Sequence, residues 1–326
     1  MIISKSPLRI SLGGGGTDLA SYYEKYGGFF ISAAINRYVY TCINRPFNEK
    51  IILKYSKNEN VSSVDEISHN IIREVIRYVN SSETAIEITS LADIPSGTGL
   101  GSSGSFTTSL LKGVLAYYGR TIDERSLAEL ACTIEIDILG ESIGKQDQYI
   151  SAFGGIKAFS IDQKGKVSIV DLLIEKEVIK YFEERLLLFF TGFTRDATSI
   201  LKNQKIRSEE NDESMINNLH QVKDIGYECK DAIEENNFER FGDLLNQHWD
   251  IKTKRSPGMT NSTINNLYQL ALANGARGGK LIGAGGGGFL LFYANRPAQL
   301  RTYMQSMGVQ EVEFRFEMTG CKLVVT

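Results

Sequence analysis

The sequence of 326 residues predicts an α+β protein with two domains. The chain is long enough for two domains of ordinary size. Short strand-like stretches dominate residues 1–160, whereas the second half alternates long amphipathic helical patterns with a few strands. A polar and charged segment, Asp162–Glu183, separates the two parts. We therefore predict domains at residues 1–170 and 171–326.

The first domain is expected to contain six strands and four helices. Strand-like runs occur at Ile10–Leu12, Phe29–Ala34, Tyr38–Arg45, Lys50–Tyr55, Ala85–Thr89 and Gly155–Ile161. Helical periodicity occurs at Leu19–Tyr26, Ser68–Asn80, Ser103–Tyr118 and Ser126–Gly140. Asp123 lies just before the last of these helices, where a short carboxylate side chain is typical of a helix cap.

The second domain is expected to begin with a buried strand at Leu186–Phe190. Helical patterns follow at Ala197–Lys205, Glu213–Glu235, Phe238–Lys254, Thr263–Asn274 and Pro297–Met307. The remaining strands are expected at Lys280–Ile282, Phe289–Tyr293, Val312–Phe316 and Lys322–Val325. A strand, helices, two strands, a helix and a strand predict a split β-α-β sheet covered by helices.

Composition and charge narrow the class of protein. The net charge is −3 and no long run of lysine or arginine occurs, which argues against a nucleic-acid partner. No apolar stretch approaches the eighteen or so residues of a membrane span, and the first residues lack the apolar core of a signal peptide. The four cysteines are scattered, without the spacing of a metal site or a disulfide framework. We expect a cytoplasmic protein without a membrane partner.

The segment Pro95–Ser105, PSGTGLGSSGS, predicts an anion-binding loop. It follows a predicted strand and leads into a predicted helix, and its glycines allow close approach of a ligand to the backbone. Serines at the start of the helix add hydroxyls beside unpaired N–H groups, which suits phosphate. The dinucleotide-binding interpretation lacks the second strand with its acidic residue. The P-loop motif and the protein-kinase signatures do not occur in the sequence.

Two further glycine-rich segments, Pro7–Asp18 and Lys280–Phe289, each follow a predicted strand. A run of four glycines could form a tight connection between strands. Glycine in such numbers lowers stability through chain entropy, however, and a site where the backbone approaches a substrate would justify that loss.

In order and spacing, the three segments resemble the motifs of the GHMP small-molecule kinases, the superfamily of galactokinase, homoserine kinase and mevalonate kinase. The similarity extends over essentially the whole chain. It implies an N-terminal domain with a left-handed β-α-β unit and a ferredoxin-like C-terminal domain. ATP and the acceptor would meet in the cleft between these domains, with ATP as phosphate donor and Mg²⁺ as cofactor.

The resemblance also implies roles for individual residues. Asp147, in the segment GKQDQY, would orient the attacking hydroxyl, and Arg9 would pair with it. Ser103 and Glu135 match the magnesium-binding positions. The nucleotide phosphates would lie against Pro95, Gly97, Gly99, Leu100, Gly101, Ser102, Ser103 and Gly104.

The acceptor would be a sugar. Asp18 matches a ligand of sugar hydroxyls, and Gly15 and Gly16 stand where galactokinase has a Glu-His pair, which argues against plain galactose. Thr17, Gly286 and Gly287, which belong to the first and third glycine-rich segments, are also expected to contact the sugar. Arg195 and Arg277 are the preferred cations for a phosphate on the sugar, and Lys145, Lys254 and Arg255 are further candidates.

The extended pattern is most similar to the D-glycero-D-manno-heptose 7-phosphate kinases. It implies transfer to the anomeric hydroxyl of a sugar phosphate, in the supply of nucleotide-activated heptose. Two alternatives stay open: a 1-kinase for fucose or another free hexose, and a non-catalytic sugar sensor on the same fold. A homodimer is also left open.

Overall fold

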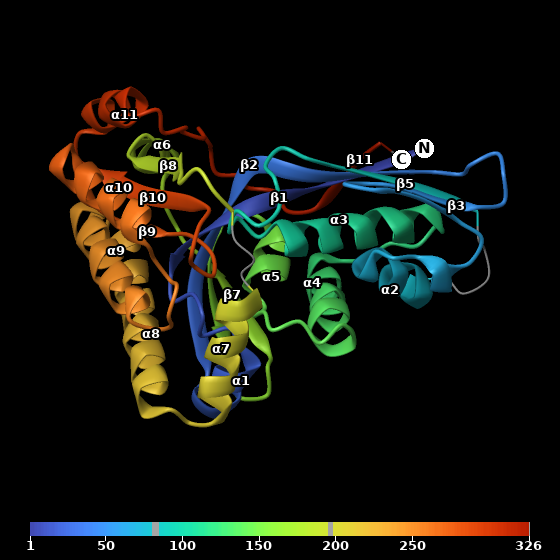
Figure 1. Ribbon diagram of the computed structural model, residues 1–326, viewed down its shortest axis with the longest axis horizontal. Coiled ribbons are helices and arrows are strands. Elements are labelled where there is room, and N and C mark those ends of the chain that lie inside the picture. The colour runs from blue at the N-terminus through green and yellow to red at the C-terminus, as the bar shows by residue number, and fades with distance from the viewer. Residues whose placement is uncertain (80–84, 195–197, 326) are drawn as a thin grey trace.

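The computed structural model describes residues 1–79, 85–194 and 198–325. These residues form two sheets, each with helices packed beside it (Figure 1). The strands of the large sheet are β1 (Ile2–Gly13), β2 (Gly28–Asn44), β3 (Ile51–Lys54), β4 (Asn58–Val61), β5 (Ile86–Ala92), β6 (Ile156–Ile161), β7 (Val167–Asp171) and β11 (Lys322–Val325). The small sheet contains β8 (Leu186–Phe190), β9 (Ala276–Leu281) and β10 (Phe289–Ala294).

The helices of the first half are α1 (Ala20–Tyr26), α2 (Asn70–Val79), α3 (Ser102–Tyr117), α4 (Glu124–Cys132) and α5 (Gln146–Phe153), with a 3₁₀ turn at Val64–Glu66 and a π-helical segment, η2 (Thr133–Ile138), directly after α4. Those of the second half are α6 (Lys176–Glu183), α7 (Thr198–Glu209), α8 (Glu213–Glu234), α9 (Phe238–Thr253), α10 (Ser262–Ala273) and α11 (Pro297–Ser306). None of the described helices is both long and apolar enough to cross a membrane.

The large sheet runs in the order β11-β1-β2-β5-β3-β4, and β6 and β7 extend from β2. β2 is one long strand, where the sequence predicted two: its first half pairs with β6 and its second half with β5. β3 and β5 are parallel neighbours, joined by a crossover that includes α2. The helices α2, α3, α4 and α5 lie together on one side of the sheet (Figure 1).

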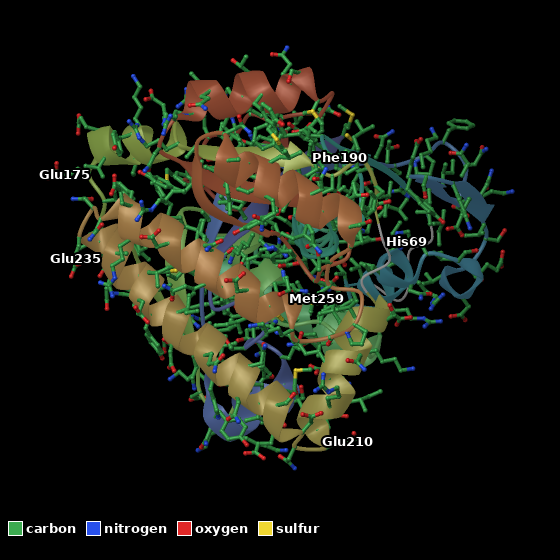
Figure 2. All side chains as sticks on the ribbon, turned by 60° about the vertical axis from the view of Figure 1, so that its left-hand side comes forward. His69, Glu175, Phe190, Glu210, Glu235 and Met259 are labelled. Carbon is green, nitrogen blue, oxygen red and sulfur yellow. The ribbon has the colours of Figure 1, made fainter. Side chains whose placement is uncertain are left out.

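The second half covers the remaining part of β1 and β2. Leu8, Ile10 and Leu12 of β1 are fully buried in one hydrophobic core with Leu188 of β8 and Phe241 of α9. Figure 2 shows α8, α9 and α10 across this side of the molecule, with Glu235 at the turn between α8 and α9. Because these residues share one core, the position of β1 is fixed relative to the small sheet. The loop that follows β1 is positioned with it.

The two-domain α+β fold is confirmed, with several differences in detail. The polar segment 162–183 carries β7 and α6, and Phe182 near the end of α6 packs fully buried against Phe238 and Phe241. The predicted strand Val312–Phe316 was wrong: the described chain makes only isolated bridges there. β11 pairs with β1 in the large sheet and not with the small one.

The helices around α5 also differ from the elements predicted from the sequence. α5 was missing from the predicted elements, and the predicted helix Ser126–Gly140 is divided into α4 and η2. Asp123 caps α4 as expected, since its carboxylate accepts the Ser126 N–H at 3.0 Å. π-Helical turns are rare in proteins, and those that occur are often found at functional sites.

Candidate active site

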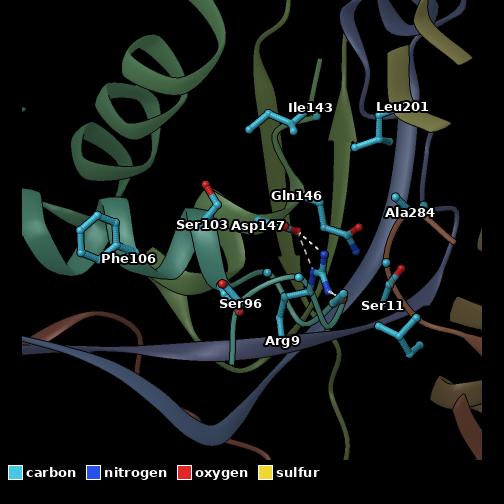
Figure 3. A pocket seen from close by; sticks show the side chains of 18 of the residues that line it. Arg9, Ser11, Ser96, Ser103, Phe106, Ile143, Gln146, Asp147, Leu201 and Ala284 are labelled. Atoms are coloured by element: carbon cyan, nitrogen blue, oxygen red, sulfur yellow. Dashed lines mark hydrogen bonds and ion pairs between the residues drawn. The ribbon is translucent and has the colours of Figure 1, made fainter. Parts of the chain in front are cut away.

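A cavity of about 710 Å³ lies where the three glycine-rich segments meet (Figure 3). Its walls come from β1, the loop after β1, the loop between β5 and α3, the start of α5, and the end of β9. Further parts of the wall come from α9 and the turn that follows it, from α7, from β5, and from the segment between β3 and the start of α2. Segments that are far apart in the sequence therefore form one site, as the glycine patterns predicted.

The loop between β5 and α3, residues 95–101, is shaped by positive backbone angles. Gly97, Gly99 and Gly101 have φ of 75°, 84° and 77°, a region that side chains with a Cβ rarely adopt. The loop ends at Ser102, the first residue of α3, whose hydroxyl lines the cavity and has no hydrogen-bond partner among the described residues. Free N–H groups at a helix start, together with this unpaired hydroxyl, suit an anionic ligand.

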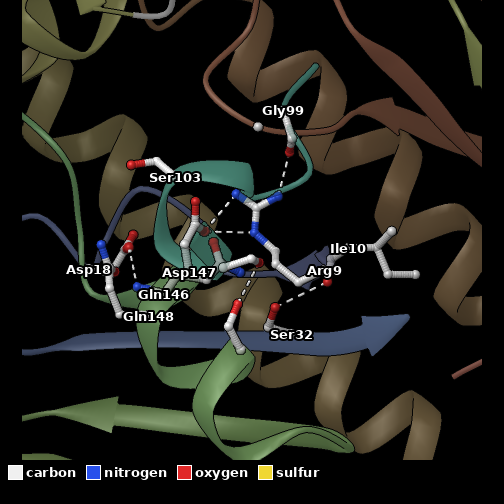
Figure 4. Close-up of polar contacts among 12 residues, drawn as sticks. Arg9, Ile10, Asp18, Ser32, Gly99, Ser103, Gln146, Asp147 and Gln148 are labelled. Atoms are coloured by element: carbon white, nitrogen blue, oxygen red, sulfur yellow. Dashed lines mark hydrogen bonds and ion pairs between the residues drawn. The ribbon is translucent and has the colours of Figure 1, made fainter. Parts of the chain in front are cut away.

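Arg9 and Asp147 form an ion pair beside this loop (Figure 4). The Arg9 Nη2 and Nε atoms lie 2.6 and 2.7 Å from Oδ1 of Asp147, and Nη1 donates to the Gly99 carbonyl. The Arg9 side chain is only 6% exposed, whereas that of Asp147 is 28% exposed and faces the cavity. One carboxylate is thus held by a buried cation and still reachable from the cleft.

Ser103 and Glu135 meet at the other side of the same helix start. The Ser103 hydroxyl donates to Glu135 Oε1, and Gln148 Nε2 donates to Oε2 at 2.8 Å. Burial raises the pKa of Glu135 to about 7, although hydrogen bonds from Ser103 and Gln148 partly offset this effect. A desolvated carboxylate of this kind is stabilised by a nearby cation.

The pair fits the Mg²⁺ expected at these positions, although Glu135 is fully buried and only Ser103 lines the cavity itself. No cluster of three or more His, Cys, Asp or Glu side chains occurs in the described ranges. Mg²⁺ does not require one, since in nucleotide sites it takes one or two protein oxygens and completes its shell with phosphates and water. Glu135 and the Ser103 hydroxyl would supply those protein oxygens.

Asp18 lies in the cavity lining near Asp147 and is 6% exposed. Its Oδ1 accepts the Gly16 N–H at 3.0 Å and its Oδ2 accepts the Gln146 N–H at 3.1 Å (Figure 4). Burial raises the pKa of Asp18, the Gln146 N–H opposes this rise, and the nearby Asp147 adds to it. Gly15 and Gly16 line the cavity beside it.

Several predicted site residues do not line the cavity. Thr17 is turned away, and its hydroxyl oxygen lies 2.7 and 2.8 Å from the carbonyl oxygens of Phe29 and Gly14, to one of which it can donate. Gly286 and Gly287 lie against Met259 and Phe193, outside the cavity. Likewise outside the lining are Pro95, which is exposed, Leu100, which is in the core, and Gly104, which packs on Asp147.

Arg277 and Arg195 were the two arginines predicted to bind a phosphate on the sugar. Arg277 is on the outer surface, where its Nε and Nη2 bind both carboxylate oxygens of Asp243 at 2.6 Å. It does not reach the cavity, so this expectation was wrong. Arg195 lies outside the described residues.

A group of basic residues lines the cavity instead, and of these the sequence analysis had named only Arg255 as a phosphate-binding candidate. His248 and Lys252 are one turn apart on α9, Arg255 follows on the same face, and Lys280 lies on β9. Their helical spacing of four and three residues was a signal in the sequence. Arg255 had been one of the weaker candidates, whereas Lys145 and Lys254 are not in the cavity lining.

These basic side chains are almost completely buried. Lys252 donates to the carbonyls of Leu281 and Gly283 at 2.9 and 2.5 Å, and Lys280 Nζ lies 3.1 Å from His248 Nδ1. Burial lowers the pKa of Lys280 to about 7, and Arg255 and Arg9 add to this effect. The pKa of Arg255 is lowered by burial to about 10, against the opposing attraction of Asp18.

Comparisons with known proteins agree with this architecture. Residues 70–155 match the model of the GHMP kinases N-terminal domain, and residues 229–310 match that of the GHMP kinases C-terminal domain. The D-glycero-alpha-D-manno-heptose 7-phosphate kinase of Campylobacter jejuni is 30% identical over 98% of both chains. The chain belongs to the GHMP kinases.

Two further relatives extend the comparison. A crystal structure described as a D-glycero-D-manno-heptose 1-phosphate kinase from Bacteroides thetaiotaomicron superposes with a TM-score of 0.82 at 25% identity, covering 100% of this chain and 99% of that one. The L-fucokinase/L-fucose-1-P guanylyltransferase of Bacteroides fragilis is 25% identical over 91% of this chain and 35% of that protein.

The low pKa of Lys280 predicts a specific dependence of stability on pH. Between about pH 7 and 10.5 the unfolded chain holds a proton on Lys280 that the folded chain lacks, so the free energy of unfolding rises with pH. Relative to Lys280→Met, the wild-type protein should gain about 3–4 kcal/mol across this range. Denaturant unfolding of the ligand-free proteins at several pH values measures this difference, and parallel curves would contradict the assignment.

Proposed function

We propose that this protein transfers the γ-phosphoryl group of ATP to the anomeric (C1) hydroxyl of D-glycero-α-D-manno-heptose 7-phosphate, giving the 1,7-bisphosphate. The observation that carries the proposal is the Arg9–Asp147 pair, which borders the phosphate-type loop and faces the same cavity as Asp18. Membership of the GHMP kinases and the names of the heptose kinase relatives support this choice of substrate.

The nucleotide phosphates would lie over the loop Ser96–Ser103. The hydroxyl of Ser102 and the N–H groups at the start of α3 would bind phosphate oxygens. Ser103 and Glu135 would hold Mg²⁺, which would neutralise negative charge on the nucleotide phosphates. In such a site the phosphates lie directly against the backbone, which leaves no room for side chains. The three glycines of positive φ in this loop agree with this requirement.

The acceptor would lie between Asp18 and Asp147. Asp18 would accept hydrogen bonds from ring hydroxyls, and Asp147 would orient the C1 hydroxyl and accept its proton as the oxygen attacks. The new bond forms between this oxygen and the γ-phosphorus, while the bond to the β,γ-bridging oxygen breaks and ADP leaves. Arg9 keeps Asp147 in place through both of its hydrogen bonds to Oδ1. The product would supply a later step that activates the sugar with a nucleotide.

The experiment that tests the substrate is an assay of ADP release with a panel of acceptors. We expect efficient turnover of the heptose 7-phosphate and much weaker turnover of free heptose, fucose and galactose. Turnover of free hexoses alone would support the 1-kinase alternative. Absence of turnover with every acceptor, together with measurable sugar binding, would support the sensor.

The positions of Asp147 and Asp18 predict opposite kinetic effects. Asp147→Asn should lower kcat by about 10²- to 10⁴-fold with little change in the sugar KM, because it removes the group that takes the proton in the transition state. Asp18→Asn should raise the sugar KM by about 10- to 100-fold with a smaller effect on kcat, because its contacts are remote from the transferred group.

Steady-state kinetics on both variants measure this separation. Asp243→Asn, which changes an exposed aspartate outside the cavity, is the matched control and should behave like the wild-type enzyme. Near-normal kcat in Asp147→Asn would contradict the role of the ion pair.

A further inference from the structure

The cavity contains more buried basic side chains than its own carboxylates can pair with. Arg9, Lys252, Arg255 and Lys280 line it, together with Asp18 and Asp147. Arg9 and Asp147 neutralise one another through their ion pair. Three buried basic groups therefore share a wall with one further carboxylate. Such an arrangement is costly unless an anion completes it.

Arg255 is the member of this wall whose hydrogen-bonding capacity is least used. Its Nε donates to Asn218 Oδ1 at 2.9 Å, and its Nη1 lies 3.4 Å from the Gly15 carbonyl. Its Nη2 has no partner in the described part of the chain, although the side chain is only 3% exposed. By contrast, Lys252 already donates to two carbonyls.

Two other polar atoms in the lining are similarly unpaired. The Ser11 hydroxyl and Gln146 Nε2 are buried and make no hydrogen bond with any described residue. Buried polar groups without partners are rare and costly, so a cluster of them around one cavity points to a ligand. All three can donate, which selects an oxygen-rich ligand.

The two glycines in this corner explain how the donors come together. A Cβ at Gly16 would lie 2.5 Å from Arg255 Nη1, and a Cβ at Gly15 would lie 3.0 Å from Ser11 Oγ. Side chains at either position would displace the donors. The Gly15-Gly16 pair thus leaves the space that the Arg255 guanidinium occupies.

The position of Arg255 favours the acceptor over the nucleotide. Its side-chain hydrogen bonds are to Asn218 and to the loop after β1, and among the described residues it makes none to the loop Ser96–Ser103. Asp18 accepts the N–H of Gln146, the chain neighbour of Asp147, and the N–H of Gly16, where a Cβ would lie 2.5 Å from Arg255 Nη1. The three groups therefore follow one another along the cavity in the order Asp147, Asp18, Arg255.

We propose that Arg255, Ser11 and Gln146 form a subsite for a phosphate group already present on the acceptor, at the end of the sugar remote from C1. Lys252 and Lys280 line the same cavity, and a bound anion would favour their protonated, positively charged forms. A phosphate monoester matches the site because it offers three acceptor oxygens and up to two negative charges, and a guanidinium can bind two of those oxygens at once. The inference rests on the proposed function, because it takes Asp147 as the position of the transferred group.

The test is to measure binding of two ligands that differ only in this phosphate. Calorimetry would be done with heptose 7-phosphate and with free heptose, in the presence of saturating Mg²⁺ and a non-hydrolysable ATP analogue so that the nucleotide site is filled. Arg255→Gln should weaken binding of the phosphorylated sugar by about 10- to 100-fold and leave binding of free heptose unchanged. Arg277→Gln, an exposed arginine outside the cavity, is the matched control and should change neither.

Ser11→Ala provides a second variant in case Arg255→Gln does not fold. Because the Ser11 hydroxyl has no partner, its removal should leave the unfolding transition unchanged. It should still weaken the phosphorylated sugar several-fold more than the free sugar. Equal weakening of both ligands, or a selective loss of affinity for the ATP analogue, would overturn the subsite.

The outcomes also separate this inference from the proposed function. If the wild-type enzyme binds the sugar phosphate through Arg255 but phosphorylates a hydroxyl other than C1, the proposed function fails and the phosphate subsite stands. If the enzyme makes the 1,7-bisphosphate and Arg255→Gln does so with unchanged KM, the subsite fails and the function stands. Wild-type protein that binds free heptose more tightly than the phosphorylated sugar would also overturn the subsite.

Discussion

The ion pair between Arg9 and Asp147 is the constraint on which the rest of the site depends. It joins β1 to the start of α5, and the same arginine binds the loop before α3 through the Gly99 carbonyl. The pair also explains two glycines. A Cβ at Gly101 would lie 3.0 Å from Arg9 Cγ, and one at Gly104 would lie 2.7 Å from Asp147 Cβ. These two glycines are required by the ion pair itself, in addition to any need for space around phosphate.

The second and third glycine segments hold each other in the same way. A Cβ at Gly99 would lie 2.4 Å from the Ile282 carbonyl oxygen, and one at Gly288 would lie 2.2 Å from that of Thr98. Lys252 of α9 also stabilises the third segment, Lys280–Phe289, by donating hydrogen bonds to the carbonyls of Leu281 and Gly283. The site is therefore built largely from backbone in close contact, and glycine is the residue that permits such contact.

The sequence was sufficient to predict the two-domain fold and the segments that form the cavity, because glycine loops and their flanking strands are local patterns. It failed where the decisive contact is non-local. Arg277 looked like a free cation until the fold placed Asp243 beside it. Lys252 and Lys280 were not among the cations selected from the sequence, because their burial depends on the packing of α9 against β9. The pairing of β11 with β1 was likewise invisible, since strand partners across hundreds of residues leave no local signal.

The most direct test of the account is the position of the new phosphate in the product, measured by phosphorus NMR with coupling to protons. After incubation with ATP, Mg²⁺ and heptose 7-phosphate, we expect one new phosphomonoester resonance coupled to the anomeric proton, with the original 7-phosphate resonance retained. This result would place the attacking C1 oxygen at Asp147. Coupling of the new phosphate to any other sugar proton would contradict the arrangement of the acceptor along Asp147, Asp18 and Arg255.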